Sequence, residues 1–148
     1  MENERNAHNF FSAYCFNKAW EFMEKPDRTP EEDEEMVLLS HTSLWHWRQR
    51  EDCQSANLWV GYWQASRIHS ILGQAEEAKR YGQLCLQHSQ EETPFLLAYA
   101  FEALARAERV AGNGLMAAKY RAEAERLADS VDDIEGRKLL LNDLQTIQ

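Results

Sequence analysis

The sequence LGQAEEAKRY, residues 72–81, is followed 39 residues later by AGNGLMAAKY, residues 111–120. Gly73 in the first stretch aligns with Gly112 in the second, and in both stretches an alanine follows this glycine by five residues and a tyrosine by eight. Glycine commonly ends a helix, and a small residue after the turn allows the next helix to approach closely. The recurrence therefore predicts two copies of one helix–turn–helix unit, not two unrelated helix ends.

The match extends into the helix that is expected before each glycine. At the same offset of 39 residues, large side chains align with large ones and small side chains with small ones. A single helix hairpin cannot bury its apolar face, so repeated hairpins are expected to stack. The aligned pairs are Tyr62 with Phe101, Ser66 with Ala105, Arg67 with Arg106, Ile71 with Val110, and Cys85 with Ala124.

Over residues 58–128 this pattern resembles the tetratricopeptide repeat family. In that family a bulky and then a small residue in the first helix precede a glycine turn, an alanine, an aromatic residue and another small residue. The period here is 39 residues instead of about 34, and Gly82 and Arg121 stand where the family usually has its aromatic residue. The resemblance implies an all-α fold: antiparallel helix hairpins stacked as a short, tetratricopeptide-like right-handed superhelix of about seven helices.

Capping signals and breakers divide the chain into helices within one domain, residues 1–148. Thr29 with Pro30, and Thr93 with Pro94, are typical helix starts, and Ser130 with Asp133 forms a further capping signature. The expected parts are a degenerate hairpin at residues 9–50, repeat-like hairpins at 55–89 and 93–129, and a capping helix at 131–146.

Charge and cysteine content exclude several classes of function. The net charge is -9 and no basic stripe is present, which argues against nucleic acids and anionic membranes as partners. The three cysteines form no disulfide or metal-binding motif, and the N-terminal residues lack the pattern of a signal peptide. We therefore expect a cytoplasmic protein.

The paired arginines suggest a binding groove. In tetratricopeptide arrays the first helix of each hairpin lines a concave groove, and Arg67 and Arg106 occupy matching positions there. Two guanidinium groups beside aromatic rings suit an acidic peptide or a C-terminal carboxylate; alternatively, each arginine pairs internally, with Glu102 or Glu108. The candidate groove residues are Trp63, Arg67, Ser70, Tyr99, Glu102, Arg106 and Arg109.

A second candidate is an aromatic pocket with histidines, for a small ligand or an enzymatic reaction, formed by His41, Trp45, His46 and Trp59. The alternative is that these aromatic residues only pack the core. His41 and His46 are five residues apart, about 140° on a helix, and no third ligand is near in sequence. No metal or cofactor is therefore expected.

The whole chain also resembles small bacterial proteins with the segment RTPEED, here residues 28–33, followed by His41 and His46-Trp47. That resemblance implies no activity. The sequence favours a non-catalytic protein–protein interaction module that binds a peptide or partner protein. A homodimer that covers exposed apolar helix faces is a further possibility.

Overall fold

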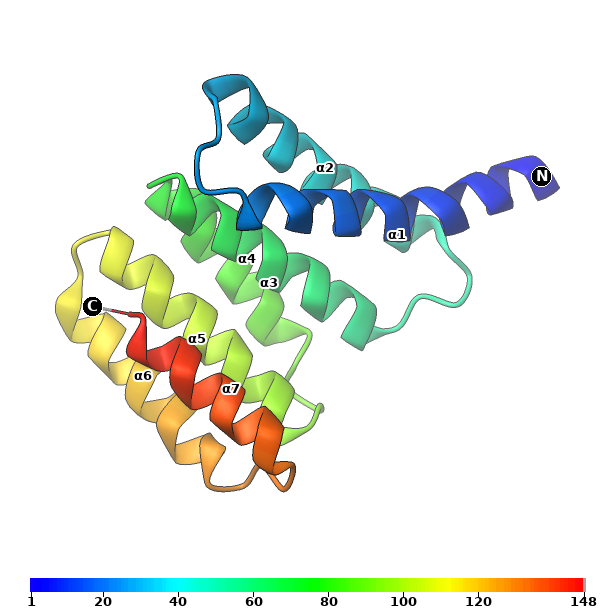
Figure 1. Ribbon diagram of the computed structural model, residues 1–148. Coiled ribbons are helices and arrows are strands. Elements are labelled where there is room, and N and C mark those ends of the chain that lie inside the picture. The colour runs from blue at the N-terminus through cyan, green and yellow to red at the C-terminus, as the bar shows by residue number, and fades with distance from the viewer. Residues whose placement is uncertain (148) are drawn as a thin grey trace.

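The computed structural model describes residues 1–147, which form seven helices and no strand (Figure 1). This confirms the prediction of an all-α fold with about seven helices. Within residues 1–147 no helix is long and apolar enough to cross a membrane. The helices are α1 (Glu2–Glu24), α2 (Pro30–Gln49), α3 (Ser55–Ile71), α4 (Ala75–Gln87), α5 (Pro94–Val110), α6 (Gly114–Ala128) and α7 (Ile134–Gln145).

The helices pack as three successive hairpins, α1 with α2, α3 with α4, and α5 with α6. Consecutive hairpins touch where α2 packs against α3 and where both α3 and α4 pack against α5. Helix α7 lies against α5 and α6, so it covers the last hairpin. The first helices of neighbouring hairpins, α3 and α5, therefore lie side by side and, with α7, form the face that carries the candidate groove.

Local capping explains most of the helix boundaries. The Thr29 hydroxyl accepts a hydrogen bond from the third residue of α2, and Thr93 does the same in α5, over 3.2 and 3.4 Å. The predicted start of the last helix is wrong in detail, because Asp133 and not Ser130 caps α7. Helix α1 begins at Glu2, well before the predicted start at Asn9. No glycine or proline interrupts residues 2–8, and the acidic side chains of the first turn stabilise the positive end of the helix dipole.

The two glycine turns have the same geometry. Gly73 and Gly112 are the only described residues with positive φ, at 72° and 79°. In both turns the amide of the next residue donates to a carbonyl five residues back, over 2.8 and 2.9 Å. This pattern is the Schellman ending of a helix, which glycine adopts without a steric penalty.

The repeat also extends to the packing of the aromatic rings. Tyr62 stacks on Tyr81 with ring centroids 6.2 Å apart, and Phe101 stacks on Tyr120 with centroids 6.0 Å apart. Each member of the second pair lies 39 residues after its counterpart in the first. The sequence repeat therefore corresponds to a repeated contact between the two helices of a hairpin.

Candidate binding groove

The seven predicted groove residues lie together on α3 and α5. Six of them line two adjoining hollows that share the side chain of Arg67. The seventh, Glu102, is completely buried. One hollow is mainly aromatic and the other is lined by arginines, so the groove has two chemically different halves.

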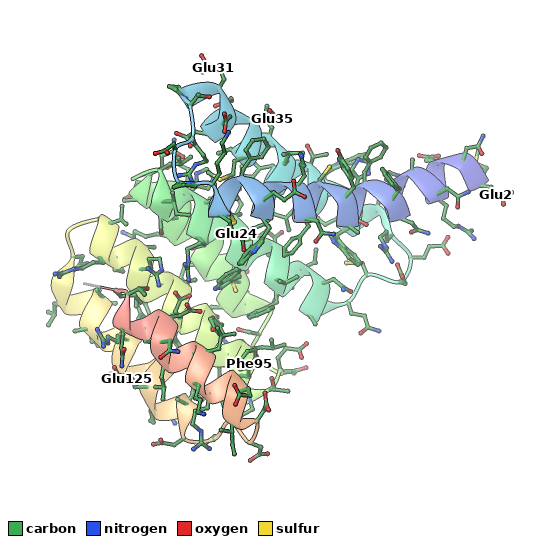
Figure 2. The ribbon with its side chains drawn as sticks, in the orientation of Figure 1. Glu2, Glu24, Glu31, Glu35, Phe95 and Glu125 are labelled. Carbon is green, nitrogen blue, oxygen red and sulfur yellow. The ribbon has the colours of Figure 1, made fainter. Side chains whose placement is uncertain are left out.

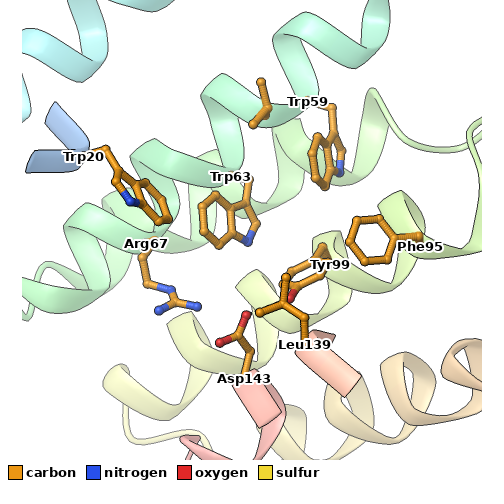
Figure 3. A pocket seen from close by; sticks show the side chains of 9 residues that line it. Trp20, Trp59, Trp63, Arg67, Phe95, Tyr99, Leu139 and Asp143 are labelled. Carbon is orange, nitrogen blue, oxygen red and sulfur yellow. Dashed lines mark hydrogen bonds between the residues drawn. The ribbon is translucent and has the colours of Figure 1, made fainter. Parts of the chain in front are cut away.

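The aromatic hollow encloses about 330 Å³ between α3, α5 and α7, and α1 contributes Trp20 (Figure 3). Trp20 stacks on Trp63 with ring centroids 5.7 Å apart. Tyr99 packs edge to face against Trp63 at 6.0 Å and against Phe95 at 5.1 Å. The lining residues are Trp20, Trp59, Val60, Trp63, Arg67, Phe95, Tyr99, Leu139 and Asp143.

Hydrogen bonds to α5 hold two of the indole rings in place. The Nε1 of Trp59 donates to the carbonyl of Leu96 over 2.9 Å, and the Nε1 of Trp63 donates to Oε2 of Glu102 over 3.1 Å. Both indole N–H groups are therefore satisfied inside the protein, and the rings offer the hollow mainly apolar surface.

Tyr99 and Asp143 connect α5 to α7 at the edge of this hollow. The Tyr99 hydroxyl donates to Oδ2 of Asp143 over 2.7 Å. Burial, and then the hydrogen bond to the neighbouring carboxylate, raise the pKa of Tyr99 well above its usual range. Tyr99 therefore keeps its proton at neutral pH and acts as a hydrogen-bond donor that positions α7.

The second hollow, of about 350 Å³, continues the groove toward the C-terminal ends of α3 and α5. Arg67, Arg106 and Arg109 line it, and within residues 1–147 no acidic side chain does. Its full lining is Arg67, Ser70, Ile71, Arg106, Arg109, Val110, Thr146 and Ile147.

Glu102 is the internal partner of two of these arginines. Its Oε1 accepts from Nη2 of Arg67 over 3.0 Å, and from Nε and Nη2 of Arg106 over 3.0 and 2.7 Å. The internal pairing that the sequence left open as an alternative is thus observed, with Glu102 in both cases. The arginines nevertheless line the hollow, and Nε of Arg67 is buried without a hydrogen-bond partner.

Arg109 differs from the other two arginines because its side chain is exposed. It lines the second hollow from its solvent side. Nearby, the hydroxyl of Ser70 is buried and unpartnered. Unused donors are therefore concentrated in this half of the groove, where an anionic group would satisfy them.

The alternative histidine pocket is not formed. His41 lies between α2 and α3, with its Nε2 3.2 Å from Nε2 of His69, whereas Nδ1 of His46 lies 2.9 Å from Nδ1 of His8 on α1. Trp45 is 55% exposed, and Trp59 lines the aromatic hollow elsewhere. The five-residue spacing places the two histidines on different sides of α2, so each packs against a different helix.

His41 and His69 form a hydrogen-bonded pair of imidazole rings. Oε1 of Gln74 lies 2.6 Å from Nδ1 of His69 and can only accept, so this Nδ1 donates to it. Burial lowers the pKa of His41, and the charges of His69 and Arg80 add to this effect. No group of three or more His, Cys, Asp or Glu side chains that could hold a metal ion occurs in the described part of the chain.

Three residues that line the aromatic hollow were not predicted from the sequence to belong to the groove. Trp20 has no counterpart in the repeat, Phe95 lies at the first turn of α5, and Asp143 lies in a helix that was expected only to cover the last hairpin. They meet because α1, α5 and α7 converge on α3, and no local sequence signal reports that convergence.

No protein-family model matches this sequence, and no curated protein or solved structure shows significant similarity to it. What the groove binds is therefore inferred from its own shape, charge and hydrogen-bonding capacity.

Proposed function

We propose that this protein is a non-catalytic, tetratricopeptide-like interaction module of the cytoplasm that holds an extended segment of a partner protein in its groove. The observation that supports this proposal is the direct contact between an aromatic hollow and an arginine-lined hollow, joined at Arg67. The first would take an apolar side chain of the partner, and the second an acidic side chain or a C-terminal carboxylate.

The aromatic hollow is suited to a large apolar side chain. Its volume of about 330 Å³ is that of a small binding pocket. The rings of Trp59 and Trp63 are held by hydrogen bonds, so little conformational entropy is lost when a ligand packs against them. A preorganised aromatic surface of this kind is typical of binding hot spots.

The arginine hollow favours an anionic group of the partner. Three guanidinium groups line it, and the one carboxylate paired with them, Glu102, is shared by Arg67 and Arg106, which leaves an excess of positive charge in this hollow. This excess occurs in a chain whose net charge is -9. An acidic segment would therefore be drawn to this part of the surface and oriented by it.

The cysteines support the proposed cytoplasmic location. Cys15, Cys53 and Cys85 are all free thiols. Burial raises the pKa of the Cys85 thiol well above its ordinary value, so it stays protonated and packs as an apolar residue. Unpaired cysteines of this kind are typical of proteins in reducing compartments.

The test is a screen of displayed random peptides with free C-termini against the purified protein. We expect enrichment of peptides with an aromatic or large aliphatic residue near an acidic residue or the terminal carboxylate. Binding of synthetic versions should change the tryptophan fluorescence, because Trp20, Trp59 and Trp63 line the hollow. Affinity should fall as salt rises.

Two surface substitutions separate groove binding from nonspecific binding. Leu139 lines the aromatic hollow and is 54% exposed, so Leu139→Glu should block the hollow without disturbing the core. Leu115 is 77% exposed and lies outside both hollows, so Leu115→Glu is the matched control. Enriched peptides that bind the Leu139→Glu variant as tightly as the control would refute the proposal.

A further inference from the structure

A second surface, on α1 and α2, carries an exposed aromatic patch, which we define as Phe10, Phe11, Tyr14 and Trp45. Their exposed fractions are 58%, 41%, 47% and 55%. Phe10 lies 5.0 Å from Phe11 and stacks on Tyr14 at 5.4 Å, measured between ring centroids. Trp45 adjoins these rings through His46, whose ring lies 5.5 Å from that of Phe11 and 5.0 Å from that of Trp45. An exposed aromatic patch is uncommon on a soluble protein and usually marks an interface.

The patch lies where the N-terminal half of α1 packs against the C-terminal half of α2, since Ser43 of α2 donates to the carbonyl of Ser12 and the ring of Phe11 lies 5.5 Å from that of His46. Figure 1 shows the N-terminal turns of α1 projecting from the body. Figure 2 places Glu2 at that projecting end, on the opposite side of the molecule from Glu125 of α6. The α1 residue that lines the groove is Trp20, near the other end of the helix. The patch is therefore a surface separate from the groove.

Two charged residues flank the patch symmetrically along α1. Glu4 lies seven residues before Phe11 and Lys18 seven residues after it. Seven residues are nearly two helical turns, so all three residues lie on one stripe, with each charge about 10 Å from Phe11. The Glu4 side chain is 70% exposed and that of Lys18 is 41% exposed. Along this stripe of α1 the three side chains are therefore acidic, aromatic and basic, in that order.

We propose that a second copy of this chain docks on the patch, with the two α1 helices antiparallel about a two-fold axis near Phe11. In this arrangement each Glu4 faces Lys18 of the other copy, and aromatic rings meet aromatic rings at the centre. A parallel arrangement would place Glu4 against Glu4 and Lys18 against Lys18. The charge pattern thus selects the antiparallel dimer, whose interface is self-complementary as two-fold symmetry requires.

The internal partners of these two charges do not prevent the pairing. Lys18 lies 3.0 Å from Glu21, and Glu4 lies 3.9 Å from His8. Both contacts join residues three or four positions apart on the exposed part of a helix, where ion pairs are weak and readily shared. The dimer proposal does not depend on the function proposed for the groove.

A charge-swap experiment tests the proposal by sedimentation equilibrium of the full chain between about 1 and 200 µM, a range that covers weak dimers. We expect the wild type to dimerise and Glu4→Lys and Lys18→Glu to dimerise roughly tenfold more weakly each, since both contacts become repulsive. An equimolar mixture of the two variants should regain wild-type affinity, because opposite charges meet again in the mixed dimer. Glu135→Lys, at an 84% exposed side chain of α7, is the control and should leave the affinity unchanged.

A second variant tests the aromatic centre. Phe11→Ser should abolish dimerisation, while circular dichroism shows the helical signal of the wild type. A wild type that stays monomeric throughout the concentration range would overturn the proposal. A mixture of the two charge variants that associates no more tightly than either variant alone would also overturn it.

Discussion

We expect the buried carboxylate of Glu102 to stabilise the groove. This carboxylate is completely buried and accepts hydrogen bonds from Trp63, Arg67 and Arg106. It therefore joins α3 to α5 and neutralises part of the positive charge beside the groove. The substitution Glu102→Gln keeps the shape of the side chain but removes the charge, which leaves two guanidinium groups without their counter-ion.

The expected cost follows from the burial of the network. Removing one partner of a buried ion pair costs about 3–5 kcal/mol. The side chains of Arg67 and Arg106 are 20% and 15% exposed, so water can partly replace the lost carboxylate. We therefore expect Glu102→Gln to lower the free energy of unfolding by about 3 kcal/mol, the lower end of that range. For a chain of this length the melting temperature would fall by roughly 6–12 °C.

Urea unfolding followed by circular dichroism measures this difference. The matched control is Glu125→Gln, which breaks the Arg121–Glu125 pair, whose side chains are 36% and 48% exposed. We expect the control to lose less than about 0.5 kcal/mol. A loss for Glu102→Gln as small as that of the control would refute the idea that Glu102 stabilises the groove.

Three further predictions concern the turns, the histidines and Tyr99. Gly112→Ala should lower the free energy of unfolding by about 1 kcal/mol, because alanine is strained at a φ of 79°. Gly114→Ala, where φ is not positive, should lower the free energy of unfolding by less. Equal decreases for the two variants, measured by urea unfolding, would contradict this account. The pKa of His41 is lowered in the folded state, so the unfolded state binds more protons and stability should fall as the pH drops below about 6.5. Unfolding at a series of pH values should show a shallower slope for His41→Gln; an unchanged slope would exclude His41 as the cause. Asp143→Asn removes the neighbouring carboxylate from Tyr99, so the raised pKa of that hydroxyl should move toward its ordinary value. Absorbance titration of the folded protein measures this movement, and an unchanged titration would show that burial alone raises the pKa.

The helix boundaries and the repeat could be predicted because their causes are local. Thr29 and Thr93 each cap the helix that they precede. Gly73 and Gly112 end their helices through the same turn. These interactions span only a few residues, so the helix boundaries can be predicted from residues that are close together in the sequence. The alignment of Arg67 with Arg106 also indicated one shared face, since helices with equivalent contacts present equivalent positions.

The chemistry of the groove was decided by tertiary structure. Glu102 binds Arg67 across two helices, and Trp20 reaches Trp63 from a third. The His41 and His46 side chains, close in sequence, are instead drawn apart into pairs with partners on different helices. Such contacts depend on how whole helices stack, and the stacking minimises the apolar surface that the seven helices together expose to water. By itself the sequence determined most of the helix boundaries, at the capping threonines and the glycine turns, and which helices repeat. Which side chains meet between them was settled only when the helices packed, because burial and charge pairing act across space and not along the chain.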